Sequence, residues 1–411
     1  MRSKVAAVRA RLHYGWIVVA TLSVTETVSW GIVYYGFPVF LRSMEEDLHA
    51  SRVAITGAFS VGLAVSAVAA IPVGRWLDRH GPRALMTAGS CLATSLMVAW
   101  SRVETLWAFY AIWCVMGLAL ATILYEPAFV AVIQWFARGR DRALLTLTLV
   151  AGLASTIFMP LEAWLLARLG WRATLLTLSV VLGLVTIPLH ALALRPAPKP
   201  ADDEPGGPGT LTIPGVDLHA AIRTVIFWAL AIAFLVRNFA TNSVTVHLIP
   251  YLVDRGYGAA VAAATVGWMG AMQLPGRVFF VPIARWLGAR WVTASIFVAQ
   301  AVGVVLITFV WFVGVGPVIV LLGAAYGMST LARATVIAEI FGRRHYGSIS
   351  GAMALGANGA RAVAPVGASL LMIAFGGYDV LFRVLAAALT LVGFAVLAFD
   401  ARPRADAGGE R

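Results

Sequence analysis

The 411-residue chain contains few charged residues and only two cysteines. Asp, Glu, Lys and Arg together make up 12% of the sequence, which is about half the share found in soluble domains. This scarcity excludes a soluble globular core of such length. Cys91 and Cys114 both lie in apolar runs, where we expect them to be buried, and two thiols form neither a disulfide framework nor a metal cluster. The sequence also lacks a nucleotide-binding loop and a nucleophile–base pair, so we expect no enzyme activity, no cofactor and no bound metal.

Apolar residues account for 60% of the chain and gather in long runs. A helix needs about 20 apolar residues to cross the hydrocarbon layer, and strands would leave backbone groups unpaired in lipid. The sequence therefore predicts an all-α membrane protein with twelve transmembrane helices. The predicted runs are residues 13–38, 52–74, 84–101, 105–135, 143–167, 173–194, 222–252, 260–284, 292–313, 316–341, 349–376 and 379–399.

Basic residues predict the orientation of these spans. Most of the 31 Lys and Arg residues fall in cytoplasmic segments if the amino terminus is cytoplasmic, as the positive-inside rule requires. The net charge of +12 is then a signal of membrane orientation. Nucleic acid is not an expected partner, because the arginines are scattered through short loops. The basic start and the long first run indicate an uncleaved first span rather than a signal peptide.

One segment breaks the apolar pattern, and a motif recurs on either side of it. Residues 195–209 are rich in Pro, Gly and acidic residues, which is typical of a mobile linker. Pro72-Val-Gly-Arg-Trp-Leu77 returns as Pro282-Ile-Ala-Arg-Trp-Leu287. We therefore predict a duplicated chain with an amino-terminal half (1–194), a cytoplasmic linker (195–221), a carboxy-terminal half (222–400) and a cytoplasmic tail (401–411).

The loop after the second predicted span carries the most specific motif. Gly74-Arg-Trp-Leu-Asp78-Arg79-His-Gly81-Pro-Arg83 follows the spacing G-x-x-x-D-R-x-G-x-R and resembles the signature loop of the major facilitator superfamily of secondary transporters. This resemblance implies two six-helix halves, with a substrate site near the midplane between them and transport by alternating access.

Other stretches resemble the bacterial branch of that superfamily related to monocarboxylate and oxalate:formate carriers. These stretches are residues 134–142, 169–172, 247–256 and 341–347. Arg277 in span 8 and Arg361 in span 11 fall where that group uses positive charge to hold substrate carboxylates.

Charged residues inside the predicted spans carry the expected chemistry. They are four arginines and three carboxylates: Arg237, Arg277, Arg333, Arg361, Glu26, Glu126 and Glu162. Each unpaired charge in a span costs at least about 2.5 to 3.5 kcal/mol, so each must face a partner or a water-filled cavity. Complete pairing still leaves one positive charge, which favours an anionic substrate held by bidentate Arg–carboxylate contacts.

Depth and helix spacing rank the predicted substrate-binding residues. Arg361 and Arg237 lie about 18 and 21 Å along their spans, near the midplane, at the rise of an α-helix. Arg277 and Arg333 are shallower. Side chains three or four residues apart share a helix face, so the amides of Asn358 and Gln273 lie on the faces of Arg361 and Arg277. Two tyrosines are candidates for lining the cavity. In order, we predict Arg361, Arg277 and Arg237, supported by Asn358, Gln273, Tyr34 and Tyr326.

Proton coupling needs a group that titrates, and arginine stays charged. We predict Glu26 in span 1 and Glu126 in span 4 as proton carriers, with His247 as a further candidate. A permanent salt bridge is the alternative for Glu126, and plain packing is the alternative for His247. Glu162, near the outer end of span 5, is expected at the mouth or in a gate.

We predict a cytoplasmic gate around the signature loop. Asp78 can accept hydrogen bonds from the free amides that open span 11 around residues 347–351, with help from the helix dipole. Gly74 and Gly81 permit the tight turn, whereas Arg79 and Arg83 position Asp78 or meet anionic lipid. Glu126 and Arg333 occupy matching depths in spans 4 and 10, and we predict an ion pair between them when the cavity faces outward.

Together these features predict a monomeric secondary carrier of the bacterial inner membrane with both termini in the cytoplasm. Its expected cargo is a small organic anion, a mono- or dicarboxylate, and its expected coupling ion is the proton. Two alternatives remain open. One is efflux of a drug-like compound, and the other is a membrane sensor that binds a metabolite without moving it.

Overall fold

The computed structural model describes residues 2–136, 139–195 and 215–398. These residues form helices joined by short turns, and no strand occurs within them. Packing divides the chain into two compact units: unit 1 comprises Met1–Gly215 and Arg343–Leu355, and unit 2 comprises Val216–Gly342 and Gly356–Arg411. Most of the predicted linker (196–214) and the whole predicted tail lie outside the described residues. The predicted halves, 1–194 and 222–400, stay a prediction.

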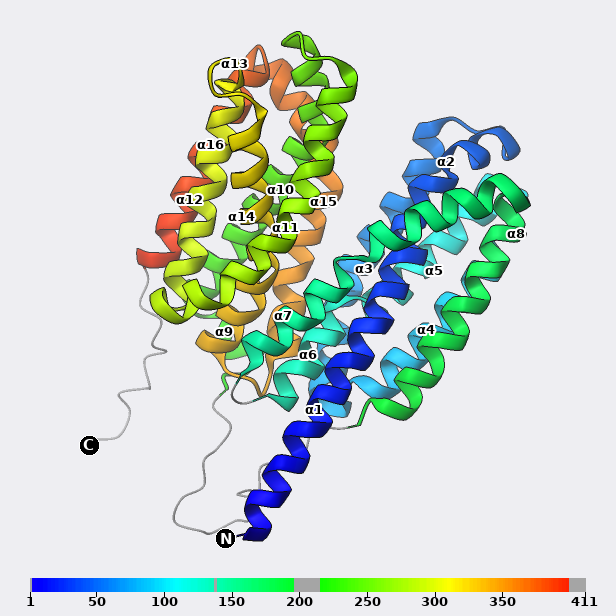
Figure 1. The fold of residues 1–411 in the computed structure, drawn as a ribbon, viewed down its shortest axis with the longest axis vertical. Coiled ribbons are helices and arrows are strands. Elements are labelled where there is room, and N and C mark those ends of the chain that lie inside the picture. Colours follow the sequence, from blue (N-terminus) through cyan, green and yellow to red (C-terminus); the bar gives the residue numbers. More distant parts are fainter. Residues whose placement is uncertain (1, 137–138, 196–214, 399–411) are drawn as a thin grey trace. The chain divides into compact units, whose positions relative to one another are not determined.

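Unit 1 contains the first eight α-helices, a π-helix and the opening turns of helix α15 (Figure 1). Their bounds are α1 (Arg2–Ser29), η1 (Trp30–Tyr35), α2 (Gly36–Asp47), α3 (Arg52–His80), α4 (Pro82–Trp100), α5 (Leu106–Ile123), α6 (Tyr125–Trp135), α7 (Arg140–Ala151), α8 (Ala154–Ala193) and α15 (Tyr346–Phe375). Helix α8 bends at Gly170, whose φ of 74° is left-handed, so it carries two of the predicted spans.

Unit 2 contains the remaining helices and the rest of α15. Their bounds are α9 (Leu218–Ile222), α10 (Val225–Asp254), α11 (Ala259–Leu287), α12 (Ala289–Thr308), α13 (Val310–Val313), α14 (Val315–Phe341) and α16 (Tyr378–Ala398). Helix α9 overlaps the end of the segment predicted as a linker (195–221). Thr224 caps α10, because its hydroxyl accepts a hydrogen bond from the amide of Phe227.

The predicted apolar runs lie in these helices, interrupted only by short breaks and turns. Eight helical segments of the described chain are long and apolar enough to cross a membrane, and α15 makes a ninth if its two parts count as one span. The predicted all-α membrane fold is confirmed, and the count of twelve spans stays consistent with it.

Each unit has its own apolar core. In unit 1, Trp100 and Trp113 are fully buried, with ring centroids 5.1 Å apart. In unit 2, Phe382 packs edge-on against Tyr251. The cysteines are not part of a core: Cys91 and Cys114 are exposed on their helices, so the expectation that they are buried was wrong.

The repeated motif ends a helix in the same way in both units. Gly81 terminates α3 and Gly288 terminates α11, with φ values of 76° and 80°. Glycine adopts such left-handed angles without steric cost. Helix α3 continues for three residues beyond Leu77, the last residue of its motif, whereas α11 ends at Leu287. The additional turn in unit 1 is what carries Asp78.

Candidate functional site

Three arginines form an electropositive cluster within unit 2. Arg237 lies on α10, Arg333 on α14 and Arg361 on the part of α15 that belongs to unit 2. Arg333 and Arg361 lie close enough for their positive charges to act on the guanidinium of Arg237. The Arg237 guanidinium stands 5.9 Å from the ring centroid of Tyr326 and donates to Asn238 Oδ1 at 3.3 Å. Like charges held together in this way attract an anion.

No carboxylate lies in the middle of a unit 2 helix among the described residues. The four that unit 2 contributes are near helix ends: Asp217, Asp254, Glu339 and Asp379. Asp217 caps α9, and Asp379 pairs with Arg255. The interior arginines of the chain therefore all belong to unit 2, and the interior carboxylates Glu26, Glu126 and Glu162 all belong to unit 1.

Three buried polar groups at this cluster form no hydrogen bond of good geometry within the described chain. They are the Nε of Arg237 and the hydroxyls of Tyr326 and Thr241, which lie next to each other. Tyr326 is only 6% exposed, and burying such groups without a well-aligned partner costs free energy. A bound carboxylate would satisfy them. Sequence reasoning missed Thr241, although its place four residues after Arg237 puts both on one face of α10.

Close packing of α11 against α14 fixes the position of the helix that carries the predicted substrate residues Gln273 and Arg277. A methyl group on Gly327 would lie 2.0 Å from the backbone oxygen of Gln273, and one on Gly276 would lie 2.2 Å from that of Ala324. Small residues allow such backbone contact between membrane helices. Arg277 is 7% exposed, one turn from Gln273. Arg277 is not among the charges that act on Arg237.

The other predicted substrate residues are half-buried. Asn358 lies on α15, three residues before Arg361, in unit 2. Tyr34 lies in η1 of unit 1, where its ring meets those of Trp30 and Phe59 at centroid distances of 4.8 and 5.4 Å. Aromatic packing accounts for the place of Tyr34 in unit 1. Six of the seven predicted substrate residues thus belong to unit 2.

Glu26 is fully buried in α1. Its Oε2 accepts a hydrogen bond from Trp30 Nε1 at 3.0 Å, whereas its Oε1 has no partner within the described residues. A carboxyl with one unsatisfied oxygen in an apolar site suits a group that gains and loses a proton.

Glu126 lies at the start of α6 and contacts the opening of α15. Its Oε2 accepts a hydrogen bond from Ser350 Oγ at 2.8 Å. The predicted partner Arg333 belongs to unit 2 and Glu126 to unit 1, so this ion pair stays a prediction.

Asp78 binds the opening of α15. Its Oδ1 accepts from the amide of Gly347 at 2.8 Å, and its Oδ2 accepts from the amide of Ser348 at 2.7 Å and from the Ser348 hydroxyl. Free amides at a helix start favour a negative charge. The predicted contact is therefore present, and its role as a gate remains a prediction.

Glycines bring the backbones of α3 and α15 together at this contact. A methyl group on Gly74 would lie 2.1 Å from the backbone oxygen of Gly347, and one on Gly347 would lie 2.6 Å from that of Gly74. Gly81, which has a left-handed φ of 76°, ends α3 three residues after Asp78. Arg79 and Arg83 are exposed, which agrees with a position near lipid headgroups.

His247 lies on α10 in an aromatic and hydroxyl environment. Its Nδ1 is 3.3 Å from the hydroxyl of Tyr378, and its Nε2 is 3.5 Å from Ser369 Oγ. The imidazole is 7% exposed. Both ring nitrogens thus have neutral partners, which suits packing as well as proton transfer.

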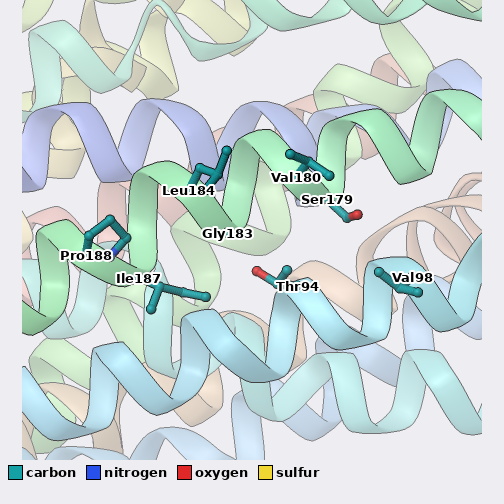
Figure 2. Close-up of a pocket in the computed structure, with 8 residues that line it drawn as sticks. All are labelled: Thr94, Val98, Ser179, Val180, Gly183, Leu184, Ile187 and Pro188. Atoms are coloured by element: carbon teal, nitrogen blue, oxygen red, sulfur yellow. The ribbon is translucent and has the colours of Figure 1, made fainter.

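A groove in unit 1 differs from these sites in chemistry. It has a volume of about 520 Å³ between α4 and α8, and Figure 2 labels the residues that line it: Thr94, Val98, Ser179, Val180, Gly183, Leu184, Ile187 and Pro188. No charged side chain lines it, and the hydroxyl of Ser179 donates to the backbone of its own helix. The groove suits lipid chains and cannot hold an anion by charge.

Comparison with known proteins identifies the class. Residues 22–365 match the Major Facilitator Superfamily, so the chain belongs to that family. The chain is 30% identical over 278 residues to monocarboxylate transporter 13 of Bos taurus, covering 67% of the chain and 62% of that protein. It is 24% identical over 237 residues to the oxalate:formate antiporter of Oxalobacter formigenes, covering 57% and 54% respectively. The matches thus span less than two thirds of the length of these relatives. The predicted resemblance to this superfamily and branch is confirmed.

Solved structures support the same fold. The E. coli fucose:proton symporter superposes with a TM-score of 0.71 at 13% identity, covering 94% of this chain and 98% of that one. The human organic anion transporter MFSD10 superposes with a TM-score of 0.70 at 13% identity, covering 94% of this chain and 99% of that one. At such identities the likeness shows the fold alone. The chain is an integral membrane protein with the major facilitator fold, and its family and relatives indicate a transporter.

Proposed function

We propose that this transporter carries a small organic anion, a mono- or dicarboxylate, by alternating access. The observation that carries the proposal is the group of arginines inside unit 2. Arg237 lies within range of the positive charges of Arg333 and Arg361. It forms no ion pair with a described carboxylate. Guanidinium groups bind carboxylates through paired hydrogen bonds. The names of the relatives, monocarboxylate transporter and oxalate:formate antiporter, support the same cargo.

The substrate site in this proposal centres on Arg237 and Arg361. Thr241 and Tyr326 supply neutral donors beside Arg237, and Arg277 with Gln273 supplies a further charge and amide on α11. Asn358 shares the helix face of Arg361. Such an arrangement holds one carboxylate through charge and orients it through hydroxyl groups.

The proposal includes coupling to protons through unit 1. Glu26 and Glu126 are the proposed carriers, because both are interior carboxyl groups with neutral hydrogen-bond donors. We further propose that the protein works as a monomer in a bacterial inner membrane, with both termini in the cytoplasm. The distribution of basic residues supports this orientation.

Uptake into proteoliposomes tests the anion site. Arg361→Gln and Arg237→Gln should abolish uptake of radiolabelled carboxylates, because each removes a positive charge and a planar pair of donors. Arg223→Gln and Arg285→Gln, which remove exposed arginines near helix ends, are matched controls and should transport normally. Unchanged kinetics in both interior variants would refute the anion site.

A pH gradient tests the coupling. Glu26→Gln should prevent uphill accumulation driven by the gradient while leaving exchange of substrate across the membrane intact, since exchange needs no net proton movement. Full gradient-driven accumulation in Glu26→Gln and in Glu126→Gln would exclude both carboxyl groups as carriers.

A further inference from the structure

Another interior carboxyl group in unit 1, that of Glu162, forms fewer hydrogen bonds than that of Glu26. Glu162 lies on α8 and is fully buried, and neither of its carboxyl oxygens has a hydrogen-bond partner within the described residues. It lies about 12 Å along the helix from the bend at Gly170, at the usual rise per residue. The carboxyl group of Glu162 is thus enclosed in this conformation, and its expected role at the mouth or in a gate stays a prediction.

The π-helix η1 and the start of α2 pack against α8 around this carboxyl group. A methyl group on Gly36, the first residue after η1, would lie 2.8 Å from Glu162 Oε1, and one on Gly31 would lie 2.2 Å from the ring of Phe158. Gly31 and Gly36 are five residues apart, which is the hydrogen-bond spacing of a π-helix. Phe158 and Glu162 are four apart, on one face of an α-helix. The π-turn thus brings two glycines onto two neighbouring side chains of α8.

The charged and titratable side chains described on the surrounding elements are engaged elsewhere or form no hydrogen bond with Glu162. Helix α8 packs against α1, η1, α2 and α4. Glu26 on α1 bonds to Trp30, Arg42 on α2 pairs with Glu46, and Asp47 on α2 pairs with Arg172. On α8 itself Arg168 stacks on Trp164, and His190 bonds to Ser90 of α4. The other such groups on these elements, none of which hydrogen-bonds to Glu162, are Tyr14, Tyr34, Tyr35, Glu45, Arg83 and Cys91.

An ionised carboxylate is not stable in such an enclosure. A buried charge without a partner is neutralised rather than tolerated, and no cation or hydrogen-bond donor among the described residues stabilises the negative form of Glu162. The packed arrangement of η1 on α8 therefore accommodates the neutral acid. Release of the proton to water leaves a carboxylate that must be hydrated, and hydration requires the contact between η1 and α8 to open.

We propose that Glu162 is a proton-binding site whose protonation holds η1 against α8 and whose deprotonation releases it. This proposal deepens the proton coupling proposed above and rests on it for its role in transport. Single π-turns inside α-helices occur frequently at functional sites. Here the π-turn brings Gly36 close to the carboxyl group of Glu162, and this close packing leaves no room for the water that an ionised carboxylate requires.

Infrared spectroscopy of the full-length protein in lipid vesicles tests the protonation state without any substrate. The spectrum of the native chain minus that of Glu162→Gln should contain the carbonyl band of one protonated carboxyl group at neutral pH, and this band should disappear in alkali. Absence of the band at neutral pH would overturn the proposal. Glu162→Ala provides the same subtraction should the Gln variant fail to fold.

Pulsed EPR tests the link to packing. Spin labels at Arg42→Cys on α2 and Arg168→Cys on α8, both exposed positions, are placed in a Cys91→Ser, Cys114→Ser background. Raising the pH should increase the separated population by up to about tenfold per pH unit, the limit for one linked proton, and Glu162→Gln should abolish this response. An identical response in the Gln variant would overturn the proposal.

Failure of this proposal and failure of the proposed function are distinguishable. If the infrared band and the EPR response occur as expected but no carboxylate is transported, the anion function alone fails. If carboxylates are transported with full proton coupling in Glu162→Gln, and the infrared band is absent, the proton site alone fails.

Discussion

Replacing Asp78 with Asn should weaken the contact between α3 and the opening of α15. The native carboxylate accepts three hydrogen bonds, from two backbone amides and one hydroxyl. An Asn side chain has one acceptor oxygen, and its NH₂ group would face one of the two amide donors. The variant therefore loses at least one hydrogen bond to a charged acceptor, each of which contributes about 1.5 to 3 kcal/mol.

The loss is large enough to be measured as a change in population. Since about 1.4 kcal/mol corresponds to a factor of ten, Asp78→Asn should raise the ratio of separated to joined molecules at least about tenfold. Spin labels at Arg75→Cys and Arg344→Cys, both exposed, report the distance between α3 and the segment before α15 by pulsed EPR in the background without native cysteines.

The control is a carboxylate in an exposed ion pair. Glu46 pairs with Arg42, and the two side chains are 67% and 85% exposed. Exposed pairs contribute about 0 to 1 kcal/mol, so Glu46→Gln should leave the distance distribution unchanged. An unchanged distribution in Asp78→Asn would show that these hydrogen bonds do not hold the two segments together.

Individual contacts elsewhere in the chain supply three more predictions. Gly74→Ala should separate α3 from α15 in the same EPR assay because its methyl group would lie 2.1 Å from a backbone oxygen, whereas Gly270→Ala, with no atom within 4 Å, should not; equal behaviour would refute the steric argument. Thr241→Val and Tyr326→Phe should each raise the KM for carboxylate uptake about fivefold, the effect of one neutral hydrogen bond of about 1 kcal/mol, and unchanged values would exclude these hydroxyls from the site. Glu126→Arg combined with Arg333→Glu should restore the closed cytoplasmic mouth lost in either single variant, as measured by cysteine accessibility; single variants indistinguishable from the native chain would rule out the pair.

The sequence was sufficient for features that depend on local spacing. The motif around Asp78 predicted its contact with the amides of residues 347–351, because an acidic side chain beside a helix start has a physical partner in the free amides. The helical spans followed from run length. The fold class, the family and its branch were also recognisable from the motifs.

Features that depend on packing were not recoverable in the same way. The π-turn Trp30–Tyr35 has no composition that distinguishes it from the α-helix around it. A methyl group on Gly31 or Gly327 would collide with a neighbouring helix, whereas one on Gly267 or Gly270 would meet no atom within 4 Å. Helical periodicity shows which residues share a face, but not whether that face meets a helix or lipid. The enclosure of Glu162 and the contact of Thr241 with Tyr326 became visible only with the neighbouring helices in place.

The arrangement of charge between the units could have been read from the sequence but was not. All four interior arginines lie after the linker, and all three interior carboxylates lie before it. Treating the seven residues as one set concealed this division. Taken by unit, it suggests that unit 2 supplies the charge for an anion and unit 1 supplies the groups that bind protons.

Uptake of matched pairs of compounds tests whether the substrate must carry a negative charge. Each pair consists of a small carboxylate and its uncharged amide, offered to the same proteoliposomes with an inward pH gradient. We predict saturable, gradient-driven uptake of at least one carboxylate and none of its amide, because the arginines of unit 2 require a negative charge. Equal uptake of acid and amide, or uptake restricted to neutral or cationic drug-like compounds, would contradict it.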